Sequence, residues 1–308
     1  MPSAARRRRA KRSLPLRGSL VATLALLDGC AHSVLDPKGP VDAADRTIML
    51  DALAIMLAIV VPTILLALGV AWRQRASNTR APYLPEWAFS GRIEAIVWSI
   101  PALVVMFLSG VIWIGCHQLD PARRLSNQPP LEVQVVALDW KWLFLYPQQG
   151  VATVNRLVIP AGQPVHFSIT SASVMNTFFV PQLGSMIYAM HGMVTPLSLE
   201  ADQPGGYLGE STQFSGDGFS DMNFEVRSVQ PAAFALWVAA ARRSGPTLDG
   251  KAYEQLEQQT QHAPPMTFGA VQPGLFQAIV AQQAPAGPGP APEAASHSGR
   301  EPVAQAER

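Results

Sequence analysis

The chain has 308 residues, of which 48% are hydrophobic and only 15% charged, and its mean hydropathy is +0.15. This composition is too apolar for an ordinary soluble domain and predicts membrane-spanning segments combined with a globular part. The formal net charge of +1 hides an asymmetry, because seven basic residues precede Cys30 and the remaining chain is net acidic. Nothing in the body of the chain therefore indicates a nucleic-acid partner.

Residues 1–29 have the pattern of an export signal. The basic stretch "RRRRAKRSLPLRG" is followed by the apolar "SLVATLALL" and then by "DGC". The apolar core is shorter than the roughly 20 residues that a spanning helix needs. The ending "LDGC" resembles a bacterial lipoprotein cleavage box, in which Cys30 would be lipidated and become the new N-terminus. The alternative is an uncleaved signal with an unmodified Cys30. Cys116 is the one other cysteine, so a disulfide framework is not expected.

Residues 47–117 are expected to form a two-helix transmembrane hairpin, after a periplasmic segment at 30–46. Apolar runs at 52–72 and 93–116 each have the length of a spanning helix. Each contains one proline, Pro62 or Pro101, which membrane helices tolerate when neighbours satisfy the released carbonyl. The loop 73–92 carries four arginines against one acid, so the positive-inside rule places it in the cytoplasm. Everything after His117 then lies in the periplasm.

Two carboxylates lie near the ends of these spans. Glu94 is expected in the first turn of the second helix, and Asp51 at the start of the first. Both positions are explained by the favourable interaction of a carboxylate with a helix N-terminus. The alternative for Glu94 is a proton path, because ionisable groups within spans are often functional.

Residues 128–230 alternate apolar and polar side chains at a period of two. "LEVQVVALDWKW", "QPVHFSIT" and "DMNFEVRSV" have this pattern and are separated by clusters of turn residues. Several short strands at this spacing predict a Greek-key β-sandwich or barrel. Residues 231–283 are expected to form a helical C-terminal arm, and the Ala/Pro/Gly-rich residues 284–308 a disordered tail.

No catalytic constellation stands out. The six histidines are dispersed along the sequence, and we interpret each as structural or solvated. The aromatic stretch "DWKWLFLY" at 139–146 is either core packing or a docking and electron-entrance surface. A secreted hydrolase is disfavoured, because no nucleophile–base pair is visible.

The segment "GESTQFSGDGFSDM" at 209–222 has the spacing of a metal-binding loop without the ligands. Ser211, Ser215 and Phe219 follow one another at four-residue intervals, and Met222 lies three residues further on. Cysteine in place of both serines and histidine in place of Phe219 would create a thiolate copper site.

Motifs along most of the chain resemble subunit II of haem–copper respiratory oxidases. They are "IEAIVWSIPAL", "DWKWLFLYP", "SVMNTFFVPQLGSMIYAMHGM" and the loop 209–222. The resemblance implies a membrane hairpin followed by a cupredoxin-like Greek-key domain with C-terminal helices. In cytochrome c oxidases this domain holds a binuclear copper centre bridged by two thiolates. Carried over by position, its ligands fall on the following residues: Asn176, Ser211, Gln213, Ser215, Phe219 and Met222.

Of these positions only Met222 keeps the family's ligand type, and the loss of the other ligands makes the chain similar to the cytochrome bo-type ubiquinol oxidase branch. "YPQQGVATVN" and "FGAVQPGLFQAIV" also resemble segments of that branch. The resemblance implies a non-redox, non-catalytic subunit of a proton-translocating oxidase in the bacterial inner membrane. This chain would bind no cofactor, while haems, copper and ubiquinol would belong to catalytic subunit I, and cytochrome c would not be a partner. It also favours the proton-path role for Glu94.

Two other functions remain as alternatives. One is a copper-binding subunit II of a cytochrome c oxidase, against which Asn176, Ser211, Ser215 and Phe219 argue. The other is a free-standing, membrane-anchored binding protein with a cupredoxin-like domain, which would purify without haem.

Overall fold

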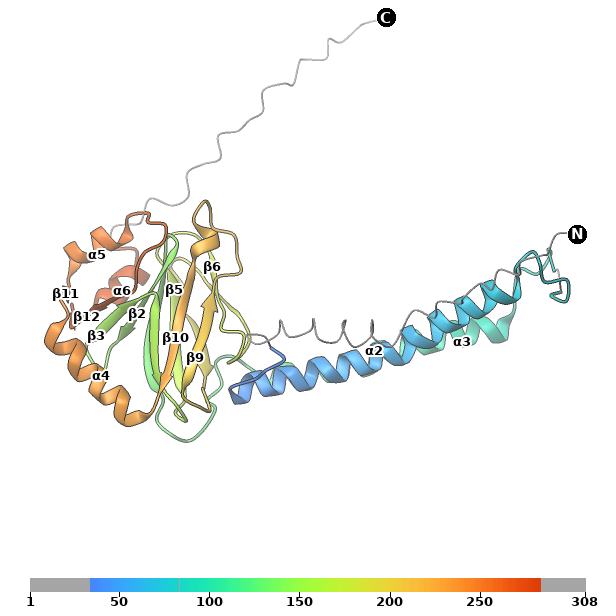
Figure 1. The fold of residues 1–308 in the computed structure, drawn as a ribbon, viewed down its shortest axis with the longest axis horizontal. Coiled ribbons are helices and arrows are strands. Elements are labelled where there is room, and N and C mark those ends of the chain that lie inside the picture. Colours follow the sequence, from blue (N-terminus) through green and yellow to red (C-terminus); the bar gives the residue numbers. More distant parts are fainter. Residues whose placement is uncertain (1–33, 83, 284–308) are drawn as a thin grey trace, which may run out of the picture.

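The computed structural model describes residues 34–82 and 84–283 (Figure 1). Two long helices extend from one side of a β-rich domain, and shorter helices cover the opposite side of that domain. The predicted signal at 1–29, its Cys30 and the tail at 284–308 lie outside the described residues.

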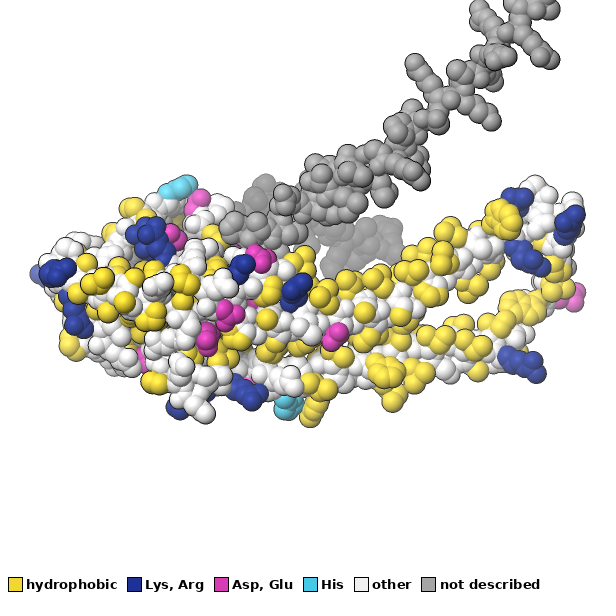
Figure 2. All heavy atoms as spheres, turned by 60° about the horizontal axis from the view of Figure 1, so that its bottom comes forward, with side chains coloured by type: hydrophobic (Ala, Val, Ile, Leu, Met, Phe, Trp, Pro, Cys, Tyr) yellow, Lys and Arg dark blue, Asp and Glu magenta, His cyan; other side chains and the backbone are white. Residues whose placement is uncertain are grey.

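Helices α2 (Pro40–Arg73) and α3 (Gly91–Gln118) contain the two apolar runs. Both are long and apolar enough to cross a membrane by length and composition. Pro62 and Pro101 lie inside them, as expected. Hydrophobic side chains cover the visible face of both helices, and basic side chains gather at the end farthest from the domain (Figure 2). The helices make contact at Gly115, where an added Cβ would lie 2.9 Å from Ile48 Cδ1.

Helix α2 begins earlier than the apolar run predicts. Pro40 occupies its first turn, a position that proline favours, so residues 40–46 of the segment expected at 30–46 are helical. Asp51 therefore lies about three turns inside α2, and its interpretation as a helix N-terminal carboxylate is wrong. The start of α2 and the residues just before it dock onto the β-domain: the amide of Lys38 donates to the carbonyl of Gln182 at 2.9 Å, and Ser185 Oγ donates to Asp45 Oδ2 in the first turns of α2 at 2.5 Å.

Two sheets form the core of the domain. In one, six strands run in the order β12 (Met266–Phe268), β3 (Val151–Val154), β2 (Lys141–Tyr146), β1 (Leu131–Leu138), β5 (Val165–Ser171) and β8 (Thr195–Leu199). The other has the order β4 (Arg156–Pro160), β10 (Asn223–Val229) and β9 (Gly205–Glu210). A separate hairpin joins β6 (Asn176–Phe178) to β7 (Ile187–Ala189). The expected β-sandwich is confirmed.

The alternating run at 131–142 does not form one strand. A tight turn at Asp139 and Trp140 divides it into β1 and β2, which pair antiparallel, and Trp140 has a φ of 63°. The turn contains neither glycine nor asparagine, the residues that normally mark such a reversal, so the sequence pattern does not reveal it.

The aromatic stretch at 139–146 belongs to the core. Trp142 and Phe144 are fully buried between the sheets, where Phe178 and Phe224 pack against them at centroid distances of 5.1–6.5 Å. Burying each such ring stabilises the fold by roughly 1.5–3 kcal/mol. Of the two interpretations of this stretch, core packing is confirmed.

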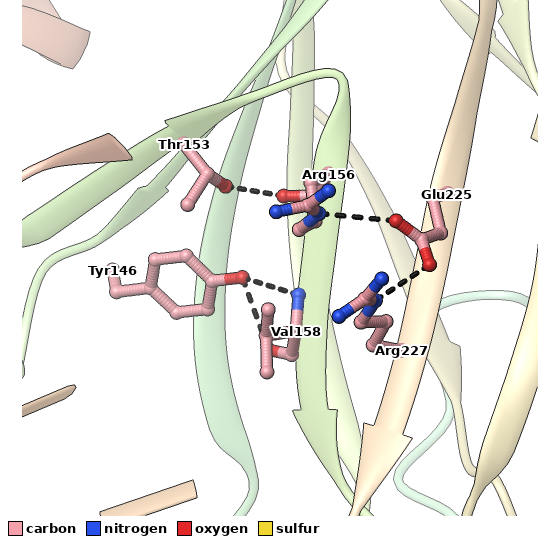
Figure 3. A network of polar contacts seen from close by, with 6 residues as sticks. All are labelled: Tyr146, Thr153, Arg156, Val158, Glu225 and Arg227. Carbon is pink, nitrogen blue, oxygen red and sulfur yellow. Dashed lines mark hydrogen bonds and ion pairs between the residues drawn. The ribbon is translucent and has the colours of Figure 1, made fainter. Parts of the chain in front are cut away.

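A polar network joins the two sheets around Tyr146 (Figure 3). Its hydroxyl accepts from the Val158 amide at 2.8 Å and donates to the Val158 carbonyl at 3.0 Å. On the neighbouring strands, Glu225 accepts from Arg156 at 3.0 Å and from Arg227 at 2.5 Å. The fully buried phenol therefore has both a donor and an acceptor, as a buried polar group requires.

The C-terminal arm contains short strands as well as helices. It contains α4 (Pro231–Ser244), α5 (Gly250–Glu257) and α6 (Leu275–Val280), together with the paired strands β11 (Thr247–Leu248) and β13 (Ala270–Val271). Strand β12 of the arm pairs antiparallel with β3 and extends the large sheet. Between the arm and the outer face of that sheet lies a second apolar cluster, which includes Leu143, Leu145, Tyr253 and Phe276.

Candidate functional site

The segment 209–222 forms the long connection between β9 and β10. Its base is closed by the Ser211 amide, which donates to the Met222 carbonyl at 3.1 Å. Trp140 contacts the loop, because its Nε1 donates to the Ser215 carbonyl at 3.1 Å. A Cβ on Gly218 would lie only 2.4 Å from the Trp140 ring. The loop is thus held in a fixed shape against the core.

Four of the six predicted copper-site positions converge and are buried. Ser211 Oγ lies 3.4 Å from Asn176 Oδ1 on the β6–β7 hairpin, and Ser215 Oγ lies 3.9 Å from Met222 Sδ. Asn176 and Met222 are each 1% exposed. The fold therefore brings together positions that are far apart in the sequence.

The other two positions are half-buried. Gln213 is half-buried and meets Ser211 Oγ only through its backbone carbonyl, at 3.5 Å. The Phe219 ring packs edge-on against the exposed Phe214 ring at 5.7 Å. The Phe219 ring has no donor atom.

The residues present do not fit a binuclear thiolate copper centre. Serine hydroxyls and the Asn176 amide are hard, neutral donors, and phenylalanine has no donor atom. Met222 offers the one soft atom among the six positions. Within residues 34–82 and 84–283, no group of three or more His, Cys, Asp or Glu side chains is placed to hold a metal ion.

Hydrogen bonds fasten the loop to the hairpin in place of metal ligands. Thr177 Oγ1 accepts from the Thr212 amide at 2.6 Å and lies 2.7 Å from Thr212 Oγ1. The Thr177 amide in turn donates to Ser211 Oγ at 3.4 Å. Sequence reasoning missed this threonine pair, because two threonines 35 residues apart carry no local signal.

Glu94 lies in the first turn of α3, where its amide donates to the Ser90 carbonyl at 3.0 Å. This is the end of the helical pair farthest from the β-domain (Figure 1). The side chain is exposed. It follows the arginine-bearing loop that connects α2 to α3, in which Arg75 lies over the Trp72 ring at 5.2 Å.

The structure does not bring the described histidines together. His117 contacts the Trp113 carbonyl, His166 the Ser198 hydroxyl, His191 the Ser171 carbonyl and His262 the Asp221 carboxylate. These contacts lie on four different parts of the chain.

A buried ionisable cluster joins the arm to the β1–β2 turn, and sequence reasoning missed it. Lys141 is 1% exposed, and its Nζ donates to the Gln258 carbonyl at 2.6 Å. Burial lowers the pKa of Lys141 to about 8, although nearby Asp139 opposes the shift. Asp139 accepts from Ser173 at 2.5 Å and from Gln259 at 3.2 Å. Burial raises the pKa of Glu257, because it disfavours the charged carboxylate as it disfavours the charged ammonium of Lys141.

Two regions of the chain match known family models. Residues 131–229 match the family described as "Cytochrome C oxidase subunit II, periplasmic domain", and residues 242–287 match the "COX Aromatic Rich Motif". The periplasmic domain of subunit II of cytochrome oxidase from Bradyrhizobium japonicum is similar in structure, at 23% identity and a TM-score of 0.37. That match covers 38% of this chain and 96% of the solved one.

Curated relatives match most of the chain. "Ubiquinol oxidase subunit 2" of Acetobacter aceti is 50% identical over 268 residues, which cover 86% of this chain and 87% of that protein. "Cytochrome bo(3) ubiquinol oxidase subunit 2" of Pseudomonas aeruginosa is 44% identical over 257 residues, covering 83% and 78%. "Quinol oxidase subunit 2" of Bacillus anthracis is 35% identical over 240 residues, covering 77% and 82%.

These matches confirm both the predicted resemblance and the predicted fold class, two apolar helices followed by a cupredoxin-like domain with C-terminal helices. By identity and coverage, the chain belongs to the family of ubiquinol oxidase subunit 2, within the subunit II proteins of the haem–copper oxidases.

Proposed function

We propose that this chain is a non-redox subunit of a proton-translocating ubiquinol oxidase, which anchors and caps the catalytic haem–copper subunit. The observation that carries the proposal is the donor set of the 209–222 loop. Ser211, Ser215 and Asn176 are buried and hydrogen-bonded where an electron-accepting copper centre would need thiolates and imidazole. Electrons from quinol then enter through the partner's haems, and this chain needs no copper relay.

The anchoring role is supported by the unpartnered surface of the helices. Large apolar side chains along α2 and α3 are 39–75% exposed, among them Leu66, Trp98 and Phe107. In a bilayer this surface meets lipid tails or the helices of a partner. The docking of the first turns of α2 onto residues 182–185 makes the anchor and the domain continuous.

Orientation follows from charge. The arginines of the α2–α3 loop favour a cytoplasmic position for it, which leaves the β-domain in the periplasm of a bacterial inner membrane. Glu94 then lies at the cytoplasmic mouth of the membrane region. There it contributes a proton entrance towards the catalytic subunit, since ionisable residues at such positions serve proton paths.

The test is purification of the complex through a tag added after Arg308, in mild detergent. We expect haem to co-purify, ubiquinol to be oxidised by oxygen, and reduced cytochrome c not to be oxidised. Electron paramagnetic resonance should show no signal of a mixed-valence, thiolate-bridged copper pair. Oxidation of cytochrome c together with that signal would establish the copper-bearing alternative. Purification without haem would establish the free-standing binding protein.

A further inference from the structure

A cavity of about 340 Å³ lies between the outer face of the large sheet and the linker that follows α3. The linker, residues 119–130, is fastened to the sheet at two points. The Ser198 amide of β8 donates to the Pro121 carbonyl at 2.8 Å, and the Leu131 amide at the start of β1 donates to the Pro164 carbonyl at 2.8 Å. The volume falls in the range of about 300–1,000 Å³ that small-molecule sites occupy.

The strand register brings polar side chains together on the floor of this cavity. Glu132 of β1 is paired with His166 of β5, and His166 with Ser198 of β8. Their neighbours along the strands, such as Val133 and Phe167, pack into the core between the two sheets. Because side chains alternate along a strand, Glu132, His166 and Ser198 lie on the outer face, where all three line the cavity. His166 Nδ1 lies 3.2 Å from Ser198 Oγ, which orients the ring.

Two opposite charges line the cavity without pairing. Arg124 lies on the linker and is exposed, and Glu132 lies on the floor and is half-buried. Within residues 34–82 and 84–283, neither side chain forms an ion pair or a hydrogen bond, whether with the other or with a third group. The neighbouring Arg123, by contrast, donates to the Gln118 carbonyl at 3.4 Å. Both charges of the cavity are therefore available to a ligand.

This pair of charges disfavours a simple ion and favours a zwitterion. An anion attracted by Arg124 is repelled by Glu132, and a cation attracted by Glu132 is repelled by Arg124. A zwitterion satisfies both groups, because a guanidinium donates two parallel N–H groups to a phosphate or carboxylate, while a carboxylate accepts from an ammonium. The His166 ring and the hydroxyl of Ser168, two residues further along β5, offer additional hydrogen bonds in the same cavity.

We propose that this cavity binds a small zwitterion, with a phosphate or carboxylate held by Arg124 and an ammonium held by Glu132. Phosphoethanolamine has this chemistry, both as a dissolved molecule and as the headgroup of phosphatidylethanolamine. Arg124 follows Gln118, the last residue of α3, by only six residues, so a headgroup and a dissolved molecule are both sources to test. The site is separate from the 209–222 loop and does not depend on the proposed quinol oxidase role.

The test is isothermal titration calorimetry of the purified full chain in a non-ionic detergent, with phosphoethanolamine as the probe. We expect one phosphoethanolamine to bind per chain, and inorganic phosphate and ethanolamine each to bind at least about tenfold more weakly. Arg124→Gln and Glu132→Gln should each raise the Kd for phosphoethanolamine at least about tenfold, because each removes a charge-assisted hydrogen bond. Glu132→Gln should not weaken the binding of phosphate.

Two matched variants serve as controls. Arg123→Gln and Glu254→Gln remove exposed charges that do not line the cavity, and neither should change the Kd. The thermal midpoint of each variant without ligand shows whether it is folded. The proposal is overturned if phosphoethanolamine does not bind the wild-type chain, if folded Arg124→Gln and Glu132→Gln bind it as the wild type does, or if phosphate alone binds equally well.

A second titration identifies the source of the zwitterion. The chain is placed in nanodiscs of phosphatidylglycerol, with or without phosphatidylethanolamine, and titrated with phosphoethanolamine. If the lipid headgroup is the ligand, phosphatidylethanolamine should occupy the cavity and raise the apparent Kd of the dissolved probe at least about tenfold. An unchanged Kd in both nanodiscs would assign the cavity to a dissolved zwitterion. Either result requires the binding that the first titration measures.

Discussion

Single residues determine which ligands the 209–222 loop offers. Ser211 and Ser215 keep the positions of bridging ligands, but their hydroxyls form hydrogen bonds to Asn176 and to the Met222 sulfur. A buried hydroxyl that has a hydrogen-bond partner is stable without a metal ion. Ser211 and Ser215 therefore hold the shape of the loop through hydrogen bonds.

Glu94 is the residue on which the proton role depends. Replacing Glu94 by Gln keeps the size and polarity of the side chain but removes its ability to take up and release a proton. We expect ubiquinol oxidation to slow several-fold in assembled complex with unchanged haem content. The measurement is oxygen consumption by purified enzyme. Glu86→Gln, in the adjoining loop, is the matched control and should turn over normally. Full activity of the Glu94→Gln complex would exclude the proton-path role.

Lys141 makes the stability of the domain depend on pH. Its pKa is about 8 in the folded chain and 10.5 in the unfolded one, so between these values the unfolded state binds more protons. The free energy of unfolding should therefore rise from pH 8 to pH 10.5, by up to about 3 kcal/mol. The thermal midpoint, followed by tryptophan fluorescence, should show this rise in the wild type. Lys141→Met should lose it, and an identical pH profile in both would refute the assignment.

At the scale of elements, the 209–222 loop is held in place by its contact with the β1–β2 turn. Gly218→Ala would force a Cβ to within 2.4 Å of the Trp140 ring, and we expect a loss of roughly 1–3 kcal/mol of stability. Thermal melting and limited proteolysis of the loop measure the effect. Gly206→Ala on β9 is the control, because nothing lies within 4 Å of its added Cβ. Equal melting of both variants would show that Trp140 does not determine the loop.

The C-terminal arm completes the large sheet instead of lying loosely on it. Strand β12 pairs with β3, and α5 and α6 cover Leu143 and Leu145, which would otherwise face water. This explains why β2 is buried on both faces and why its sequence shows no clear alternation between positions 141 and 146.

At the scale of the whole molecule, the helical pair and the β-domain form one continuous body through the extended N-terminus of α2. A lipid on Cys30, ten residues before Pro40 in the sequence, would add a third attachment to the membrane. We expect the mature chain to start at Cys30 and to carry acyl chains, detectable in its intact mass. Cys30→Ala should abolish the lipid and leave a longer chain. A wild-type mass that still includes residues 1–29 would favour the uncleaved signal.

The sequence by itself determined the two long apolar helices, the strand-rich domain and the residue types of the 209–222 loop, because each of these depends on local residue pattern. The two long helices follow from apolar runs that are long enough to cross a bilayer, and the absence of thiolate and imidazole donors follows from residue type alone at Ser211, Ser215 and Phe219. Period-two alternation correctly predicted strands around β1, β5 and β10.

Only the tertiary structure decided features that depend on contacts between distant segments. The turn at Asp139 and Trp140, the pairing of β12 with β3, and the Thr177–Thr212 contact leave no periodic pattern in the sequence. From the sequence alone Lys141 would be expected at the surface, but the C-terminal arm covers it, and its Nζ donates to the Gln258 carbonyl. Periodicity indicates which face of a segment is buried, whereas long-range packing sets which segment it packs against, and here that packing brings Asn176 to Ser211.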